Sequence, residues 1–490
     1  MKKNLYLNSI LLIFYQILAI IIGLIIPRLI ISEYGSSING LVQSITQMLS
    51  IISLLDLGVG SVVQSKLYKP LYENNLKMVS EIYNASRLFY KLIGKILIFY
   101  VIFLCIYYIF ASSQDFEPFF YVSLIFSIAI NFFFQYYLGL ANMNLLGADQ
   151  KYYIISLVNS CTIIVNFLIT YYLVNSQTSI QIVMFFSSVI YIFRPILLSL
   201  YVKKNYKIEK TFKNNEVLKD KWNGFYQHIS TILSNSAPII VLTIFGNFKL
   251  ISIYTVYNLP LNATRNIFDI LSQTFKSHFG LLIASKSNKY LNLSFKKFEL
   301  ISHLLLVAIF ATLSKSLMPF VILYTKNIKD IDYSYNTFSI IISLSCTLYI
   351  LRLIYSTLVF SAGHFRQTQK YSVNEVILNF ILAIILFKFY GISGIGYALC
   401  ISILYRVISL VHYLSKQIIT RPVFHFYKLL LVDLFSVGVL AFINSLFHYT
   451  NEKFIHFILL SILIFFIDII FSCSIFLLFF YSDFKKLFYK

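Results

Sequence analysis

Charged residues are scarce in this sequence of 490 residues. Asp, Glu, Lys and Arg together make up 12% of it, about half the share found in soluble globular domains. Hydrophobic residues make up 59%, and apolar runs of about 20 residues, the length that a helix needs to cross a bilayer, recur from end to end. This composition excludes a soluble globular protein and predicts an all-α, polytopic membrane protein.

The sequence also lacks the patterns of common metal and nucleotide sites. Its five cysteines all lie in apolar runs without a CxxC pair, so we interpret them as small core residues rather than disulfides or zinc ligands. Its eight histidines show no HExxH spacing, and no GxxxxGK[ST] motif occurs, which argues against metal-dependent or ATP-driven chemistry. We expect no cofactor, no metal, no catalytic residue and no enzymatic activity.

About fourteen membrane spans are predicted from the apolar runs. The first is interpreted as a retained helix rather than a signal peptide, because its apolar stretch is too long and ends in Pro27-Arg28 instead of small residues. The predicted spans are residues 5–27, 39–64, 92–111, 119–145, 153–174, 179–202, 225–246, 251–275, 300–323, 334–361, 371–390, 392–414, 428–447 and 455–481.

Basic residues sort strongly by side when these spans are threaded with the N-terminus inside. Of the 40 Lys and Arg residues, 28 fall on inner segments, 6 on outer connections and 6 within spans. The positive-inside rule therefore predicts that both termini are cytoplasmic. The net charge of +21 is then explained by contact with anionic headgroups, so we expect membrane lipids as partners and no nucleic acid. The outer connections are too short for an extracellular catalytic domain.

Two local matches indicate a duplicated unit of six helices. Gln150-Lys151-Tyr152 recurs as Gln369-Lys370-Tyr371 after 219 residues, and Tyr34-Gly35 is echoed by Phe245-Gly246 after 211 residues. Parallel repeats of this kind build many secondary transporters, with the substrate site at the interface between lobes. The predicted organisation is an N-terminal lobe at 1–202, a basic cytoplasmic linker at 203–224, a C-terminal lobe at 225–414 and a C-terminal helix pair at 415–490.

Polar residues fall on single faces of several predicted spans. In span 251–275 and just after it, they follow steps of 4, 3, 4, 3 and 4, which places them on one helical face. Such side chains are too costly to face lipid, so a polar cleft between the lobes is expected, with hydrogen bonding between packed helices as the alternative. The polar residues are Asn258, Asn262, Arg265, Asp269, Ser272 and Lys276; in other spans they are Asn8, Gln16, Asn39, Gln43, Thr46, Ser50, Ser53, Gln227, Thr231, Ser234 and Asn235.

Charged residues within the spans are candidates for function. Arg265 and Asp269 are four residues apart, so they form either a neutral structural pair or an anion ligand with an orienting carboxylate. Arg352 has no acidic neighbour in its own span, which favours ligand binding, whereas snorkelling is the default for Arg28. Guanidinium groups suit phosphate because they donate two hydrogen bonds at once.

The predicted site follows from these stripes and charges. The substrate-binding candidates are Arg265, Arg352, Arg28, Asn258, Asn262, Asn39, Gln43 and Asn235. The candidates for ion coupling or charge pairing are Asp269, Asp56 and Glu375. Arg194, Arg406 and Lys315 also lie within spans, without an assigned role.

The first 70 residues carry motifs of a known family. These are Asn8-Ser9-Ile10, Tyr15-Gln16-Ile17-Leu18, Ile26-Pro27-Arg28, Tyr34-Gly35, Asn39-Gly40-Leu41-Val42 and Ser53-Leu54-Leu55-Asp56-Leu57-Gly58-Val59-Gly60. They resemble the polysaccharide-exporter branch of the multidrug/oligosaccharidyl-lipid/polysaccharide (MOP) flippase superfamily, in particular capsule and O-antigen repeat-unit flippases of the Wzx type. Beyond these residues the resemblance is mainly topological.

The resemblance implies two six-helix lobes around a cationic cavity in a bacterial cell membrane. The implied substrate is an undecaprenyl-pyrophosphate-linked oligosaccharide, moved from the inner to the outer leaflet by alternating access. Lipid II flippases are similar in carrying arginines that correspond to Arg28 and Arg265, and in a final helix pair that shelters the lipid tail. Many capsule flippases have twelve spans, so a lipid II flippase or a cation-coupled small-molecule exporter is the alternative. A monomer that contacts a polysaccharide polymerase and glycosyltransferases is expected.

Overall fold

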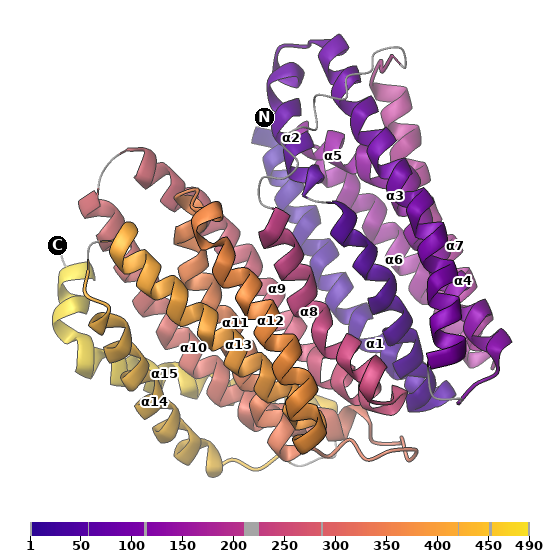
Figure 1. Cartoon of the computed structure of the whole chain (residues 1–490). Coiled ribbons are helices and arrows are strands. Elements are labelled where there is room, and N and C mark those ends of the chain that lie inside the picture. The colour runs from indigo at the N-terminus through magenta and orange to yellow at the C-terminus, as the bar shows by residue number, and fades with distance from the viewer. Residues whose placement is uncertain are drawn as a thin grey trace. The chain divides into compact units, whose positions relative to one another are not determined.

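The computed structural model describes residues 2–56, 58–111, 115–209, 225–285, 288–419, 421–449 and 453–488, and these residues form helices without a strand. Figure 1 shows the elements in chain order. They are α1 (Lys2–Ser50), the 3₁₀ helix η1 (Ile51–Asp56), α2 (Val59–Tyr72), α3 (Leu76–Ala111), α4 (Pro118–Phe134), the π-helical turn η2 (Gln135–Gly139), α5 (Leu140–Ala148), α6 (Tyr152–Asn175), α7 (Ile180–Asn205), α8 (Phe225–Phe245), α9 (Phe248–Ala284), α10 (Asn288–Tyr324), α11 (Asn336–Ser361), α12 (Phe365–Tyr390), α13 (Ile392–Gln417), α14 (Phe424–Ser445) and α15 (Phe454–Phe488).

Eleven of the helical segments among these residues are long and apolar enough to cross a membrane. Three places account for the difference from the fourteen predicted spans. Leu7–Asp56 counts as one segment, although the backbone of α1 leaves the helical region at Gly35. The shorter apolar helix at Ile229–Phe245 is counted separately, and the polar stripe of α9 lowers its hydropathy. The multi-pass architecture is confirmed, while the count of fourteen stays a prediction.

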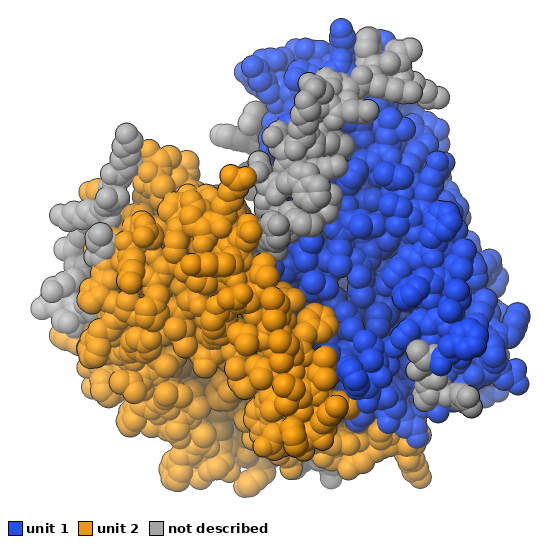
Figure 2. Space-filling model, viewed as in Figure 1, with its two compact units in different colours: residues 1–252 blue, residues 253–490 orange. Residues whose placement is uncertain are grey.

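The chain divides into two compact units, residues 1–252 and 253–490 (Figure 2). The first unit includes α8, which the sequence analysis assigned to the second lobe. The Ser44 hydroxyl of α1 hydrogen bonds with that of Thr243 in α8 at 2.7 Å. A Cβ atom at Gly40 would lie 1.7 Å from the carbonyl oxygen of Phe248, so only glycine allows this approach. Residues 210–224, most of the predicted linker, lie outside the described residues.

The second unit contains α10 to α15 and most of α9. Apolar side chains of α10, α14 and α15 share one core, which includes Leu304, Leu429 and Phe476. In Figure 1, α14 and α15 accordingly lie beside α10. The C-terminal helix pair is therefore packed into the second unit rather than attached by a single connection.

Residues with positive φ recur at a similar spacing in two pairs of helix connections. Gln150, between α5 and α6, has φ 55°, and Gly363, between α11 and α12, has φ 74°. Gln177, between α6 and α7, has φ 53°, and Gly391, between α12 and α13, has φ 54°. The separations are 213 and 214 residues, close to the 211 of the second sequence match. Gln369, the sequence match of Gln150, lies inside α12.

Candidate functional site

The polar stripe of α9 faces α11 within the second unit. Asp269 accepts hydrogen bonds from the Tyr349 hydroxyl at 3.0 Å and 3.1 Å. One turn further, the Ser272 hydroxyl lies 2.5 Å from that of Thr357. The Ser361 hydroxyl donates to the backbone carbonyl oxygen of Lys276. Part of the stripe therefore joins packed helices, as the alternative interpretation expected.

Tyr349 connects the charged residues of α9 with those of α11. Its ring lies 4.5 Å from the guanidinium carbon of Arg352 and 5.5 Å from that of Arg265. Both distances fall within the range of cation–π attraction. Because its hydroxyl binds Asp269, this one side chain contacts two cations and an anion.

Glu375 of α12 pairs with two arginines from neighbouring helices. Its Oε1 accepts a hydrogen bond of 2.7 Å from Arg352 of α11, and its Oε2 accepts one from Arg406 of α13. All three side chains are buried. One carboxylate thus opposes two guanidinium groups, so this buried triad carries a formal charge of +1 that remains uncompensated within it.

Arg265 is held much more loosely than Arg352. Its Nη1 lies 3.5 Å from the side-chain oxygens of both Asn258 and Asn262, the outer limit for a hydrogen bond. Among the described residues, its buried Nε has no hydrogen-bond partner and no carboxylate forms an ion pair with it. The direct Arg265–Asp269 pair that the spacing allowed is not formed. The planar guanidinium of Arg265 therefore retains hydrogen-bonding capacity that an oxyanion could use.

The remaining predicted residues lie in the first unit. Asn39 is buried, and its amide donates to the Ser252 hydroxyl at 2.8 Å. Gln43 is half-buried, whereas Arg28 and Asn235 are exposed. Asp56, at the end of η1, lies within hydrogen-bonding reach of Tyr90 of α3. The structure thus brings together Arg265, Asn258, Asn262, Asp269, Arg352 and Glu375, and it describes Arg28, Asn39, Gln43, Asn235 and Asp56 in a separate unit.

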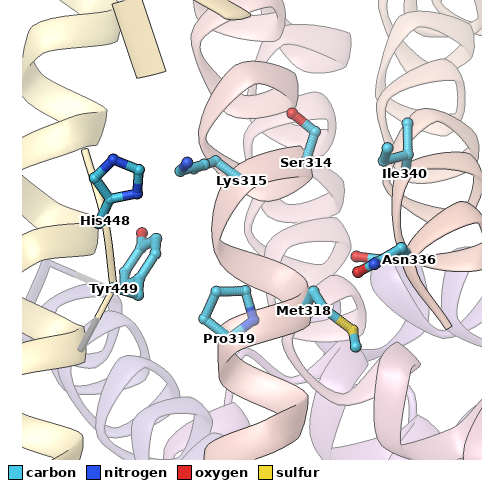
Figure 3. Close-up of a pocket in the computed structure, with 9 residues that line it drawn as sticks. Ser314, Lys315, Met318, Pro319, Asn336, Ile340, His448 and Tyr449 are labelled. Atoms are coloured by element: carbon cyan, nitrogen blue, oxygen red, sulfur yellow. The ribbon is translucent and has the colours of Figure 1, made fainter. Parts of the chain in front are cut away.

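A recess that includes a lysine lies between α10, α11 and the segment after α14 (Figure 3). Its volume is about 350 Å³. Lys315 of α10 and His448 line it from one side, and Asn336 of α11 lies opposite. Ser339, a further lining residue, has a buried hydroxyl oxygen without a hydrogen-bond partner among the described residues. Lys315 therefore faces a polar recess rather than an apolar helix contact.

Sequence reasoning missed Tyr349 and a buried network around His303. A signal for Tyr349 was present, because Ser345, Tyr349, Arg352 and Ser356 repeat at steps of 4, 3 and 4 and so share one face of α11. Glu299 and His303 are also four residues apart on α10. Their partners lie more than 50 residues away along the chain, so spacing alone could not reveal the network.

The comparisons with known proteins concern the fold. No family model and no curated protein sequence matches the chain. A structure of the lipid II flippase MurJ in an inward closed conformation is similar with a TM-score of 0.67 and 16% identity, covering 98% of this chain and 99% of that one. An inward-facing multidrug resistance MATE family transporter of the MOP superfamily has a TM-score of 0.60 and 11% identity, with coverage of 81% and 95%.

A eukaryotic MATE transporter gives a TM-score of 0.62 at 12% identity, covering 84% of this chain and 95% of its own. These identities are too low to identify a function, but the similarity extends over nearly the full length of each structure. The chain therefore has the all-helical fold shared by the lipid II flippase MurJ and the MATE transporters of the MOP superfamily.

Proposed function

We propose that this protein is a flippase for an undecaprenyl-pyrophosphate-linked oligosaccharide repeat unit used in capsule or other surface polysaccharide synthesis. It would act in the bacterial cell membrane with both termini cytoplasmic and move its substrate from the inner to the outer leaflet by alternating access. The observation that carries the proposal is Arg265, a loosely held guanidinium on a polar helix face, in a chain with the fold of a flippase.

The charge of the α9–α13 cluster suits a pyrophosphate. Arg265, Arg352 and Arg406 stand against Asp269 and Glu375, which leaves a formal excess of one positive charge. Arg352 and Arg406 are already bound to Glu375. In our proposal these two arginines supply a fixed positive field, and Arg265 binds the oxyanion directly. The hydrogen bond from Tyr349 keeps Asp269 from pairing with Arg265.

Lipid II is the second candidate substrate. The match to the lipid II flippase MurJ covers 98% of this chain, whereas the two MATE transporters cover 81% and 84%. The additional coverage favours a lipid-linked substrate over a small molecule, because the C-terminal helix pair would be available to shelter a lipid tail. A cation-coupled small-molecule exporter remains the third candidate.

The decisive experiment depletes the protein and identifies the lipid-linked saccharide that accumulates in the inner leaflet. A surface-polysaccharide repeat unit supports the proposal, and lipid II supports the second candidate. Rescue of a strain that lacks its peptidoglycan flippase gives an independent test of the lipid II role. If no lipid-linked saccharide accumulates, the flippase proposal is wrong.

Variants of Arg265 test the binding site. Arg265→Ala should abolish export at unchanged protein abundance, because both the charge and the hydrogen-bonding fork are lost. Arg265→Lys should retain part of the activity as a point charge. Lys249→Ala is the matched control, because it removes a cation from the first turn of the same helix, whereas Arg265 lies several turns later in it. Full export by Arg265→Ala would contradict the anion-binding role.

A further inference from the structure

A buried polar network links α10 and α11 to α14 and the segment before it. Arg421 donates two hydrogen bonds of 2.5 Å and 2.6 Å to the two carboxylate oxygens of Glu299. Glu299 also accepts a hydrogen bond of 2.8 Å from the Tyr355 hydroxyl. His303 lies next in the chain of contacts, with Nε2 2.9 Å from that hydroxyl and Nδ1 2.6 Å from Oδ2 of Asp433.

The donors and acceptors of this network determine its proton count. A carboxylate that accepts two hydrogen bonds from a guanidinium is ionised and has no proton to donate. The Tyr355 hydroxyl must therefore be the donor in its hydrogen bond with Glu299. The Tyr355 oxygen is then the acceptor for His303, and Nε2 of the imidazole must carry a proton. A neutral imidazole would therefore present a bare Nδ1 to a carboxylate oxygen at 2.6 Å, two acceptors in contact. One further proton must lie between Nδ1 and Oδ2.

We infer that His303 and Asp433 form a proton-binding site buried in the second unit. With the proton bound, the charges of Glu299, Asp433, Arg421 and His303 cancel. Without it, the buried network carries one uncompensated negative charge, which is unfavourable away from water. The site is separate from the α9–α13 cluster, and the inference stands whether or not the proposed substrate is correct.

The two members of this site differ in exposure. The His303 side chain is fully buried, whereas the Asp433 side chain is 16% exposed. The second Asp433 oxygen, Oδ1, is buried and has no hydrogen-bond partner among the described residues. Exchange of the proton therefore depends on Asp433, the more exposed of the two side chains.

Charged and titratable groups surround His303 on several of the described elements. Glu299 faces it from α10, Tyr355 from α11, Arg421 from the segment before α14, and Asp433 from α14 itself. His425, at the start of α14, lies 3.9 Å from Glu299 and adds a second titratable ring. The described residues that α15 contributes to the neighbouring core are Cys473, Ile475, Phe476 and Phe480, and none of them is charged.

The consequence is a proton-dependent contact between α10 and α14. The protonated pair joins His303 to Asp433, and hence the C-terminal helix pair to the rest of the second unit. Loss of the proton places an imidazole lone pair against a carboxylate and weakens this contact. The apolar core shared by α10, α14 and α15 would keep the helices associated, so the expected response is local loosening rather than unfolding.

Ring-nitrogen NMR of the full-length protein labelled with ¹⁵N-histidine tests the inference. At neutral pH, one imidazolium signal insensitive to bulk solvent is expected, and it should disappear in His303→Gln. It should also disappear in Asp433→Asn, where the amide can donate to Nδ1 and a neutral imidazole suffices. His456→Gln, in α15, is the matched control and should retain the signal. A neutral His303 beside an ionised Asp433 in the wild type overturns the inference.

Hydrogen exchange of α14 against pH gives a second readout, which also serves if His303→Gln does not fold. Exchange of the α14 amides, corrected for the intrinsic effect of pH, should increase in the wild type as the imidazolium signal is lost. In Asp433→Asn this step should be absent. A protection profile that is the same in both proteins at every pH would show that no titrating proton holds α14, and would overturn the inference.

Discussion

Replacing Glu375 with glutamine should destabilise the second unit strongly. The Glu375 side chain is 1% exposed, and those of Arg352 and Arg406 are 8% and 4% exposed, so water cannot substitute for the lost charge. A glutamine amide has one acceptor oxygen and an NH₂ donor group, so it can satisfy one arginine while its NH₂ group opposes the other. Removing one partner from a buried ion pair costs about 3–5 kcal/mol, and we expect a loss in this range.

Denaturant titration of the purified protein in detergent micelles measures this loss as a change in the free energy of unfolding. The control is Glu73→Gln, the same substitution in the surface pair with Lys69, whose 3.8 Å contact is largely exposed. Such surface pairs contribute less than about 1 kcal/mol. Adding Arg406→Met to Glu375→Gln should recover part of the stability, because one unpaired charge is removed. If Glu375→Gln lowers the free energy of unfolding no more than Glu73→Gln does, the Glu375 carboxylate does not neutralise the two arginines as described.

Three further predictions concern individual contacts. Gly40→Ala should lower the free energy of unfolding by about 1–3 kcal/mol and reduce the yield of folded protein, because the new Cβ would meet the Phe248 carbonyl. An unchanged thermal midpoint would contradict the close approach. Thr312→Val should cost about 1–3 kcal/mol in the same denaturant titration, since Asp468 loses a 2.7 Å hydrogen bond, and Thr312→Ser should be nearly neutral. Tyr349→Phe should leave abundance unchanged but reduce export, because Asp269 is released toward Arg265; export equal to wild type would show that the hydroxyl has no role.

Hydropathy predicted most of the helices because apolar length is a local property. Each of the fourteen predicted spans overlaps a helix of the structure. Membership of the two units was harder to infer, because it depends on which helices touch. The packing of α8 against α1 rests on contacts such as Ser44 with Thr243, about 200 residues apart, and no local pattern reports them.

In the candidate site, too, local features were predicted from the sequence and contacts between helices were not. The α9 stripe was visible because helical spacing alone puts its members on one face. The absence of an acidic neighbour in its own span favoured Arg352 as a ligand residue, whereas its carboxylate partner, Glu375, comes from the next helix. Spacing identifies which residues share a face, but it does not identify what that face contacts.

The turns with positive φ suggest a way to stabilise the chain by substitution. In these two pairs of turns the later one has glycine, Gly363 and Gly391, and the earlier one has glutamine, Gln150 and Gln177. A side chain in this conformation costs about 1–2 kcal/mol, partly offset by the entropy that glycine loses on folding. The glycines of the C-terminal half thus indicate which residue to introduce at the two glutamine positions of the N-terminal half. Gln150→Gly and Gln177→Gly should each raise the free energy of unfolding by up to about 1 kcal/mol.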